Sequence, residues 1–564
     1  MPQFLVAPDA DFTGGALTTL VNAVLSDSSS LSGLTNGTGY RAVALSSASP
    51  VFTPEGPDIP APIVSGSIRS MMMIGQGGTT LNNERAIFRL RDRSNVRCAD
   101  PWFEFFHGRI LSGGQVGMSI ETTLPSGVTC NYRCAILTGI SGTGKNQSAA
   151  TVHRLTFFDM NDDAAFIAAG GSVSGDGRTI TVPNGRRFRS DRLDGVVFEA
   201  SDEYFIQTEC VAADGSVANN PRGRISQPTL GDINIAVPAG DTADWVYATD
   251  WSSRLSSAPS SGCGPIAVLG TGEPGVKTVI VDGDSIISQS ASPFTGPNNT
   301  DIGNSLGVVA FAKRALSEAG YSYIDVSVPG TNIGNFMGGY NKDGIRADLM
   351  QYGDAVITDH GHNDRRSGIA FDAVAGWSEA SPSTWNSTGL RTRLEWHNEW
   401  LRSKIKPGGR IVRCTLSPQT NSTDAWATAE NQTGKNDDST WAADYATTAT
   451  GDQFKLGDLI MLRGLYTGLT PGGAGLHDAG YDLYAGLGGT ADGKWPATGT
   501  ADGTHPSEAL HIAAAADLRP RLADLLGWVG DPSSQQINDE PNSSQQINDE
   551  PSSSLSAINR AAYY

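Results

Sequence analysis

Between residues 66 and 251, short stretches of alternating apolar and polar residues are separated by turn sequences such as ADGS, SGDG and PNG. Alternation with a period of two is typical of a β-strand that buries one face, and Gly, Asn and Asp favour the turns between strands. This spacing predicts an all-β module, a sandwich or jelly roll, over 66–251. The candidate strands are RAIFRLRDR, WFEFFHGRIL, MSIETTL, TVHRLTFFD, RTITVP, GVVFEA and YFIQTECVA.

From residue 276 onward, stretches of strand length alternate with stretches in which apolar residues recur every three or four positions. The second spacing is typical of an amphipathic helix. Strand sequences occur within 276–283, 323–330, 354–364 and 411–418, and helices are expected before Gly320, over Leu390–Ile405 and over 507–528. Alternating strands and helices predict a three-layer α/β domain with a mainly parallel sheet over 276–530.

The remaining segments fit neither pattern. Residues 1–65 contain one candidate helix, at 16–25, within Ser-, Gly- and Pro-rich sequence, and we assign them to attachment or to assembly as a homo-oligomer. Residues 252–275 read as a connector. The last segment, 531–564, contains SSQQINDEP twice. Such a polar repeat cannot bury a core, so a linker followed by a short C-terminal tag is expected.

Length and charge limit the classes of partner. A chain of 564 residues is too long for one hydrophobic core. Its 40 Lys and Arg residues against 59 Asp and Glu residues give a formal net charge of −19, which argues against nucleic acid as a partner. No stretch is long and apolar enough for a membrane span, and no secretory signal is visible at the N-terminus. Localisation therefore stays open.

Cysteine and histidine usage gives no indication of a metal or another cofactor. The six cysteines are too few and too scattered for a disulfide scaffold. Cys130 and Cys134 have no second Cys/His pair at zinc-ligand spacing. His360 and His362 would share one face of a strand, but no third ligand is evident, so a structural role is favoured. We expect neither a metal nor a cofactor.

Small and polar residues follow three of the predicted strands. Ser285 follows the first within Gly283-Asp284-Ser285, Gly330 follows the second and Asn363 follows the third. The carboxyl ends of parallel strands lie at one edge of a sheet, where α/β folds bind ligands. Ser285 is therefore either an ordinary turn residue or a nucleophile, and a nucleophile needs a base and oxyanion donors.

A candidate base lies near the end of the chain. Asp502 and His505 are three residues apart in DGTHPS, just before the last predicted helix. On a tight turn this spacing brings the carboxylate to one imidazole nitrogen and leaves the other nitrogen for Ser285. The backbone N–H groups of Ser285 and Gly330 and the side-chain amide of Asn363 are candidate oxyanion donors.

In this order, these blocks resemble those of the SGNH, or GDSL-type, hydrolases. The four blocks are Gly283-Asp284-Ser285, Gly330, Gly361-His362-Asn363-Asp364 and Asp502-Gly503-Thr504-His505. The resemblance covers about 276–530, less than half of the chain. It implies a three-layer α/β fold in which Ser285 is the nucleophile, His505 the base and Asp502 the acid that orients the base.

The same resemblance implies an oxyanion hole formed by Ser285, Gly330 and Asn363, with Gly283 and Asp284 supporting the nucleophile. The glycine block reads VPGTN and lacks the asparagine that often precedes its glycine. Gly334 lies close by and is an alternative to Gly330 as the second donor. The family needs no metal.

The GHND and DGTHPS forms look most like the carbohydrate acetylesterase branch of this family. The resemblance therefore implies a carboxylic ester hydrolase that removes O-acetyl groups from an acetylated carbohydrate, here a polysaccharide, through an acyl-enzyme. A lipase or thioesterase is an alternative, but the loops around the blocks are polar. A second alternative is a virion-associated phage tail spike or receptor-binding protein that deacetylates host surface glycan, because the chain shows no export signal. The N-terminal module would then attach to the particle.

Tryptophan gathers in the later part of the chain. Trp396 and Trp400 lie four apart on a predicted helix and are expected to pack. Four others lie in polar insertions, where they either stack on sugar rings or anchor long loops: Trp377, Trp385, Trp426 and Trp441.

Overall fold

The computed structural model of the chain consists of two compact units, Met1–Pro60 and Ala61–Tyr564. The helix expected at 16–25, the tail 531–564, and Trp377, Trp385 and Trp441 lie outside the described residues. The structure describes residues 6–8, 40–42, 61–69, 76–81, 85–110, 121–124, 128–158, 163–214, 218–221, 224–225, 231–237, 241–254, 256–257, 261–288, 310–334, 344–365, 390–434 and 477–528.

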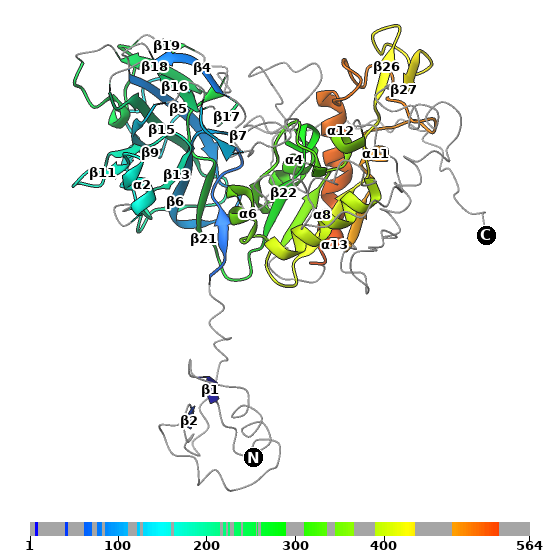
Figure 1. The fold of residues 1–564 in the computed structure, drawn as a ribbon, viewed down its shortest axis with the longest axis horizontal. Coiled ribbons are helices and arrows are strands. Elements are labelled where there is room, and N and C mark those ends of the chain that lie inside the picture. The colour runs from blue at the N-terminus through cyan, green and yellow to red at the C-terminus, as the bar shows by residue number, and fades with distance from the viewer. Residues whose placement is uncertain are drawn as a thin grey trace, which may run out of the picture. The chain divides into compact units, whose positions relative to one another are not determined.

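Most described strands of the second unit that precede residue 272 belong to two larger antiparallel sheets (Figure 1). In the described part of the chain, the larger sheet has eight strands, in the order β11 (Ser172–Val173), β12 (Ile180–Val182), β9 (Cys130–Thr138), β15 (Glu203–Ala212), β5 (Arg85–Arg93), β18 (Ile233–Val237) and β19 (Ser256–Ser257), with β10 (Thr151–Arg154) beside β9. The smaller sheet has five, in the order β13 (Arg186–Arg189), β6 (Cys98–His107), β21 (Ala267–Thr271) and β3 (Ile63–Ser65), with β14 (Val197–Phe198) beside β6.

Other strands of the described chain form separate antiparallel pairs. These are β1 (Val6–Pro8) with β2 (Tyr40–Ala42), β4 (Gln76–Leu81) with β16 (Ala218–Pro221), β7 (Arg109–Ile110) with β8 (Glu121–Thr122), β17 (Arg224–Ile225) with β20 (Ser261–Gly262), and β26 (Thr420–Ser422) with β27 (Gln432–Gly434). The antiparallel strands predicted from the alternating pattern are thus confirmed, although several are shorter than the apolar stretches that predicted them.

The later strands form a parallel sheet of five strands, as predicted for this part of the chain. Their order is β23 (Ser322–Asp325), β22 (Thr278–Asp282), β24 (Ala355–Thr358), β25 (Arg410–Cys414) and β28 (Ala479–Tyr481). Within this sheet, β22 comes first along the chain, β23 pairs on one side of it, and β24 then pairs on its other side. Such a reversal opens a crevice at the carboxyl ends of β22 and β24, where α/β sheets bind ligands.

Helices cover both faces of the parallel sheet, which gives the three layers that the sequence predicts. Apolar side chains of one face pack with α6 (Ile345–Met350) and α8 (Leu390–Lys404). Those of the other face pack with α3 (Ser285–Ser288), α4 (Phe311–Glu318), α12 (Glu508–Leu518) and α13 (Leu522–Leu525). Shorter described helices are α2 (Ala164–Ala168), η3 (Trp245–Tyr247), α7 (His362–Arg365) and α11 (Leu483–Gly486).

The last helix differs from its expected length. The sequence predicts one helix over 507–528, but the structure has α12, a 3₁₀ turn η6 (Arg519–Arg521) and α13. Pro520 lies at the start of the turn, and its ring nitrogen carries no hydrogen for an i→i−4 bond. The proline therefore divides the predicted helix into two.

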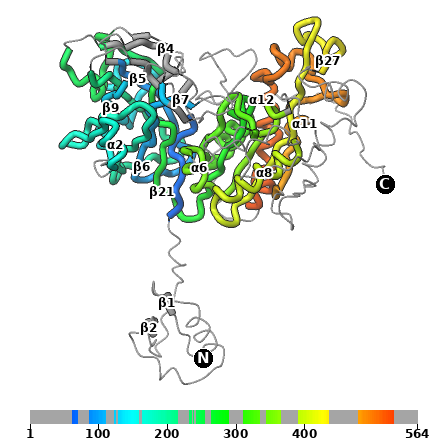
Figure 2. The backbone as a smooth tube through the Cα atoms, viewed as in Figure 1, coloured from blue at the N-terminus to red at the C-terminus, as the bar shows by residue number. Residues whose placement is uncertain are grey.

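Strand β6 buries side chains on both of its faces. Phe103 and Phe105 belong to the hydrophobic cluster between the two antiparallel sheets. Trp102 and Phe106 point the other way and belong to the cluster that contains Ile280 of the parallel sheet. Figure 2 shows the blue-to-green antiparallel part next to the green-to-orange α/β part. The two parts therefore share one hydrophobic cluster, and each has a further cluster of its own.

Hydrogen bonds cross the same seam. The backbone N–H of Ser65 donates to Ser322 Oγ at 2.9 Å, and Thr278 Oγ1 donates to the carbonyl of Ile63 at 3.0 Å. The segment 252–275, read as a connector from the sequence, contains β19, β20 and β21 instead, and β21 pairs with β6 of the smaller sheet. Within the described part of the chain, none of the helices combines the length and the apolar character that crossing a membrane requires.

Candidate active site

Ser285 lies at a sharp turn between the central strand and a short helix. Strand β22 ends at Asp282, and Ser285 is the first residue of α3, 7% exposed. Between them Gly283 has a φ of +150°, and a Cβ there would collide with Asp359 Oδ1. Only glycine gives the turn both this conformation and this close approach.

His505 and Asp502 form a tight turn before α12. Asp502 Oδ1 accepts hydrogen bonds from the backbone N–H groups of Thr504 and His505, both at 2.8 Å. The second carboxylate oxygen lies 2.7 Å from His505 Nδ1. The three-residue spacing therefore brings the carboxylate to the imidazole, as predicted.

The structure brings Ser285 to the other side of this imidazole, across 220 residues of sequence. His505 Nε2 lies 2.8 Å from Ser285 Oγ. Burial alone would raise the pKa of Asp502, but hydrogen bonds from the His505 ring and from the two backbone amides lower it well below its usual range. A stable carboxylate fixes the tautomer that leaves Nε2 free to accept the serine proton.

Gly503 of this turn packs against the hairpin formed by β26 and β27. Thr420 N donates to the carbonyl of Gly503 at 2.9 Å, and the φ of Gly503 is +72°. A Cβ on Gly503 would collide with the Thr420 carbonyl and approach the ring of Trp426. Trp426 donates from Nε1 to Thr420 Oγ1 at 3.0 Å, so in this structure its indole anchors the hairpin beside the turn of Asp502 and His505.

The glycine block is joined to the nucleophile turn. Val328 N donates to the carbonyl of Gly283 at 3.0 Å, and Gly330 follows in the next turn. Asn363 Nδ2 donates to the carbonyl of Thr331 at 3.0 Å and to Asp284 Oδ2 at 3.3 Å. Asn363 thus contacts both the nucleophile turn and the loop that carries Gly330, and its amide is directed at protein acceptors.

Gly334 is the alternative donor to Gly330, but its N–H already has an acceptor. It donates to Asp364 Oδ1 at 3.0 Å, and the neighbouring N–H of Ile333 donates to Asp364 Oδ2 at 2.8 Å. Arg393 of α8 donates to the same carboxylate at 2.9 Å. These contacts favour Gly330 as the second backbone donor.

Two charged residues near the turn were given no role from the sequence, although Asp364 belongs to the GHND block. Asp359 contacts the backbone of the nucleophile turn, and Asp364 holds the loop after Gly330. Asp364 ends the GHND block, and Asp359 lies two residues before the block begins. For Asp359, the signal available in the sequence was a carboxylate directly after a buried strand. Their contacts depend on the pairing of β22 with β24, which composition does not reveal.

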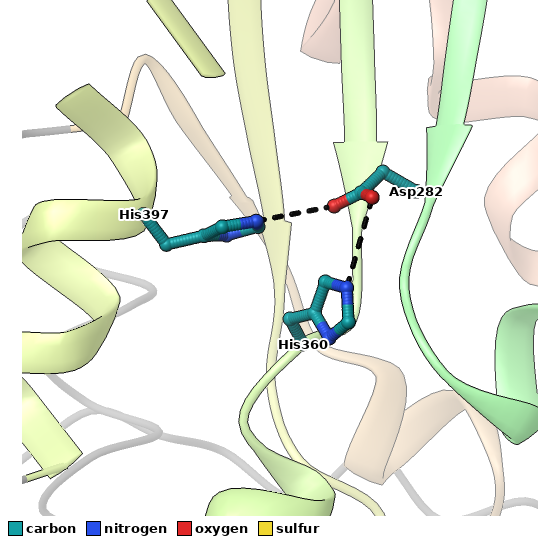
Figure 3. A group of neighbouring side chains, drawn as sticks. All are labelled: Asp282, His360 and His397. Carbon is teal, nitrogen blue, oxygen red and sulfur yellow. Dashed lines mark ion pairs between the residues drawn. The ribbon is translucent and has the colours of Figure 1, made fainter. Parts of the chain in front are cut away.

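His360 and His362 do not act together as a pair. His362 lies between Ser417 and Gln419, whereas His360 lies in a group with Asp282 and His397 (Figure 3). The sequence showed no third partner for His360, because His397 comes from α8 and Asp282 from β22. All three side chains are fully buried below the carboxyl edge of the sheet.

The group of Asp282, His360 and His397 could hold a metal ion, since ligand atoms from each lie within 4.8 Å of one another. Arg346 Nη2 occupies the same space, 2.7 Å from Asp282 Oδ1 and 3.4 Å from His360 Nε2. A guanidinium keeps its charge, so a metal ion would lie beside a fixed cation. The donors fit a buried ion-pair network better than a metal site, and we derive no step through a metal.

This network shifts the pKa values of the buried residues beneath the nucleophile turn. Burial would raise the pKa of Asp282, but His360 and Arg346 lower it well below its usual range. Burial and the nearby cations, including Arg413, lower the pKa of His397 well below its usual value. Burial raises the pKa of Asp284. The charges below the site are thus arranged around Asp282 and are separate from the path that joins Ser285 to Asp502.

Tryptophans of the helix behave as predicted, since Trp396 and Trp400 are 5% and 6% exposed and lie in the core. The six cysteines are all buried, and none of them forms a disulfide.

Comparison with known proteins gives structural neighbours at low identity. No family model matches the chain, and no curated protein matches it. An active-site mutant of a family two carbohydrate esterase from Clostridium thermocellum is 11% identical, with 83% of this chain and 99% of that chain covered and a TM-score of 0.28. The family two carbohydrate esterase from Cellvibrio japonicus is also 11% identical, with 83% and 96% covered and a TM-score of 0.28.

A third neighbour is shorter. The carbohydrate acetylesterase family member from Sinorhizobium meliloti is 14% identical, and the alignment covers 45% of this chain and 100% of that chain with a TM-score of 0.27. At these identities and TM-scores, the chemistry of this chain has to be assigned from its own side chains.

Proposed function

We propose that this chain is a serine esterase in which Ser285, His505 and Asp502 form the catalytic triad. One observation carries the proposal: hydrogen-bonding distances of 2.8 Å and 2.7 Å run from Ser285 Oγ through the imidazole to the Asp502 carboxylate. Serine is a weak nucleophile until a base accepts its proton, and this path supplies the base together with the acid that orients it.

In the first half-reaction, His505 Nε2 accepts the proton of Ser285 Oγ while the oxygen attacks the ester carbonyl. The carbonyl oxygen becomes an oxyanion. When the tetrahedral intermediate collapses, the ester C–O bond breaks, and the imidazolium gives its proton to the leaving alcohol. Asp502 stabilises the imidazolium throughout and remains ionised. The product at this stage is an acyl group bound to Ser285 Oγ.

In the second half-reaction, His505 accepts a proton from water, and the hydroxide oxygen attacks the acyl carbonyl. The bond to Ser285 Oγ then breaks, Oγ regains a proton from the imidazolium, and the carboxylic acid leaves. Both steps pass through an oxyanion. We assign its donors to the N–H groups of Ser285 and Gly330 and to Asn363 Nδ2, whose longer contact, to Asp284 at 3.3 Å, is the one an oxyanion would replace.

The ester we propose is an O-acetyl group on a polysaccharide. The GHND and DGTHPS blocks support this choice through their resemblance to carbohydrate acetylesterases. Side chains beside the block residues are polar as well: Ser417 and Gln419 contact His362, and Thr420 lies against Gly503. A lipase would instead need an apolar channel for a long acyl chain.

The test is acetate release from a small aryl acetate and from a panel of acetylated glycans. Ser285→Ala should abolish turnover and leave the fold intact, because alanine has no oxygen to acylate. A serine-directed phosphonate should modify Ser285 in the wild-type chain, as read by mass spectrometry. Substantial activity of Ser285→Ala, or labelling at another residue, would contradict the triad.

A further inference from the structure

Asp359 is a buried carboxylate that has no place in the proton path of the triad. It follows β24 and is 2% exposed. Its Oδ1 accepts a hydrogen bond from Asp284 N at 3.1 Å, and its Oδ2 accepts one from Ile287 N at 3.0 Å. One side chain thus contacts the backbone on both sides of Ser285.

We propose that Asp359 is a positioning residue that sets the direction of the Ser285 hydroxyl and N–H by holding the nucleophile turn at two points. The inference rests on the proposed function, because positioning matters only if Ser285 reacts. A displacement of about 1 Å in a reacting group can cost about a hundredfold in rate.

The first argument comes from the four consecutive amides of the turn. Asp359 holds those of Asp284 and Ile287, and the Asp284 side chain accepts from Ile286 N at 3.0 Å. The remaining amide belongs to Ser285. It opens α3, where a helix N–H has no intrahelical acceptor. The carboxylates thus engage three amides and leave the one that the mechanism assigns to the oxyanion.

The second argument comes from the space around the carboxylate. In the pairing of β22 with β24, Asp282 lies opposite Thr358, so the next residues of both strands meet at the edge of the sheet. Because Gly283 has no Cβ, Asp359 Oδ1 can lie where a Cβ would otherwise be. The glycine of the nucleophile block therefore serves this contact as well as the turn.

The third argument is energetic. Burial, and then repulsion from Asp284, raises the pKa of Asp359 well above its usual value. The charged form of this side chain therefore costs free energy at this position. A side chain that served only to fill space would avoid this cost. Asparagine, the uncharged side chain closest in shape, has an NH2 group in place of one oxygen, so it would turn a donor toward one of the two amides.

The experiment compares Asp359→Asn with Asp354→Asn. Asp354 precedes the same strand and is a matched control at the opposite end: its Oδ2 accepts from Thr278 N at 2.9 Å and pairs with Lys406. Four quantities are measured for each folded variant: kcat and KM for an aryl acetate, the rate at which a phosphonate labels Ser285, and the melting temperature.

Asp359→Asn should lower kcat by about 10- to 100-fold and change KM by less than about threefold, since a misdirected nucleophile affects the reaction more than binding. Labelling of Ser285 should slow by a similar factor. Asp354→Asn should leave kcat and labelling near wild type, even if its melting temperature falls. A folded Asp359→Asn with wild-type kcat and labelling, or equal kinetic losses in both variants, overturns the inference.

The outcomes separate the two proposals. A wild-type chain that hydrolyses no ester refutes the proposed function, and the labelling rates of the variants still decide the role of Asp359. If Asp359→Asn does not fold, hydrogen exchange of the wild-type chain decides. The amides of Asp284 and Ile287 should then be protected, and rapid exchange at both would overturn the inference.

Discussion

Asp502 combines exposure with a strongly held charge. Its side chain is 47% exposed, yet hydrogen bonds from His505 and from two backbone amides lower its pKa well below its usual range. The carboxylate therefore stays ionised well into the acid range. The proposed role, to orient the base, can be tested by a substitution that keeps the shape of the side chain.

Asp502→Asn should lower kcat steeply, by up to about 10⁴-fold, because the amide fixes the wrong imidazole tautomer. The measurement is kcat for an aryl acetate, with circular dichroism to confirm the fold. Asp492→Asn is a suitable control, since Asp492 lies in a neighbouring loop and pairs with Lys494. A loss of less than about tenfold would argue that Asp502 does not orient His505 during turnover.

The same assignment predicts the pH profile. Protonation of His505 removes the base, so kcat/KM should fall as the pH falls and rise to a plateau once the imidazole is neutral. Because the pKa of Asp502 is lowered, the acid limb should follow the gain of a single proton. A steeper limb that reports two protons would show that Asp502 titrates together with the base.

Asn363 gives a prediction about the transition state. Asn363→Ala should lower kcat by about 10²- to 10³-fold with little change in KM, because the oxyanion exists only in the transition state and the intermediates next to it. Steady-state kinetics on an aryl acetate provide the measurement. An effect confined to KM would instead make Asn363 a residue that binds the substrate.

At the level of elements, the hairpin of β26 and β27 contacts Gly503 in the turn of Asp502 and His505. Gly503→Ala should lower kcat by at least about tenfold, since the new Cβ collides with the Thr420 carbonyl and shifts the turn that carries His505. Gly488→Ala is the matched control. Its φ of +68° imposes the same backbone strain, but its new Cβ would lie in ordinary contact, 3.5 Å from Pro496. Equal kcat values for both variants would show that the hairpin contact does not position the base.

Elements with one clear periodicity could be predicted from the sequence, and those shaped by distant partners could not. The alternation in Glu203–Ala212 and the helical spacing in Leu390–Lys404 led to the correct elements. Strand β6 carries large apolar residues in both phases of the alternation, and this signal of two buried faces was not used. Pro520 was also visible in the sequence, but the apolar residues on both sides of it favoured one continuous helix.

The same distinction applies to the site. The Asp502–His505 turn could be predicted because its contacts are local, and Ser285 because its block has a recognisable form. The hydrogen bonds of Asp359 depend on strand register and could not. The structure supplies them because β22 and β24 are neighbours, although 75 residues separate Asp284 from Asp359.

At the scale of the whole molecule, the shared hydrophobic cluster predicts how the chain tolerates truncation. A chain of residues 61–532 should fold and keep the kcat of the full chain, because it retains every described residue of the second unit. By length alone, the α/β part over 276–530 is large enough for an independent core. A chain of residues 276–532 tests this. It should instead aggregate or bind a hydrophobic dye, since it lacks Trp102 and Phe106, which bury the apolar side chains around Ile280.

Size-exclusion chromatography and aryl acetate kinetics on both truncated chains provide the measurement. The full chain assayed in parallel controls for the loss of the first 60 residues. A monodisperse, fully active 276–532 chain would show that the α/β part folds alone and that the shared cluster contributes little to its stability.

Ser285 and His505 are far apart in the sequence, so the ribosome synthesises them at different times. Ser285 leaves the ribosome 220 residues before His505. At roughly 5–20 residues per second, this interval lasts roughly 10–40 s. Throughout it the nascent chain carries a serine with no base beside it. The proposed mechanism therefore predicts that a nascent chain hydrolyses no ester before His505 has been synthesised.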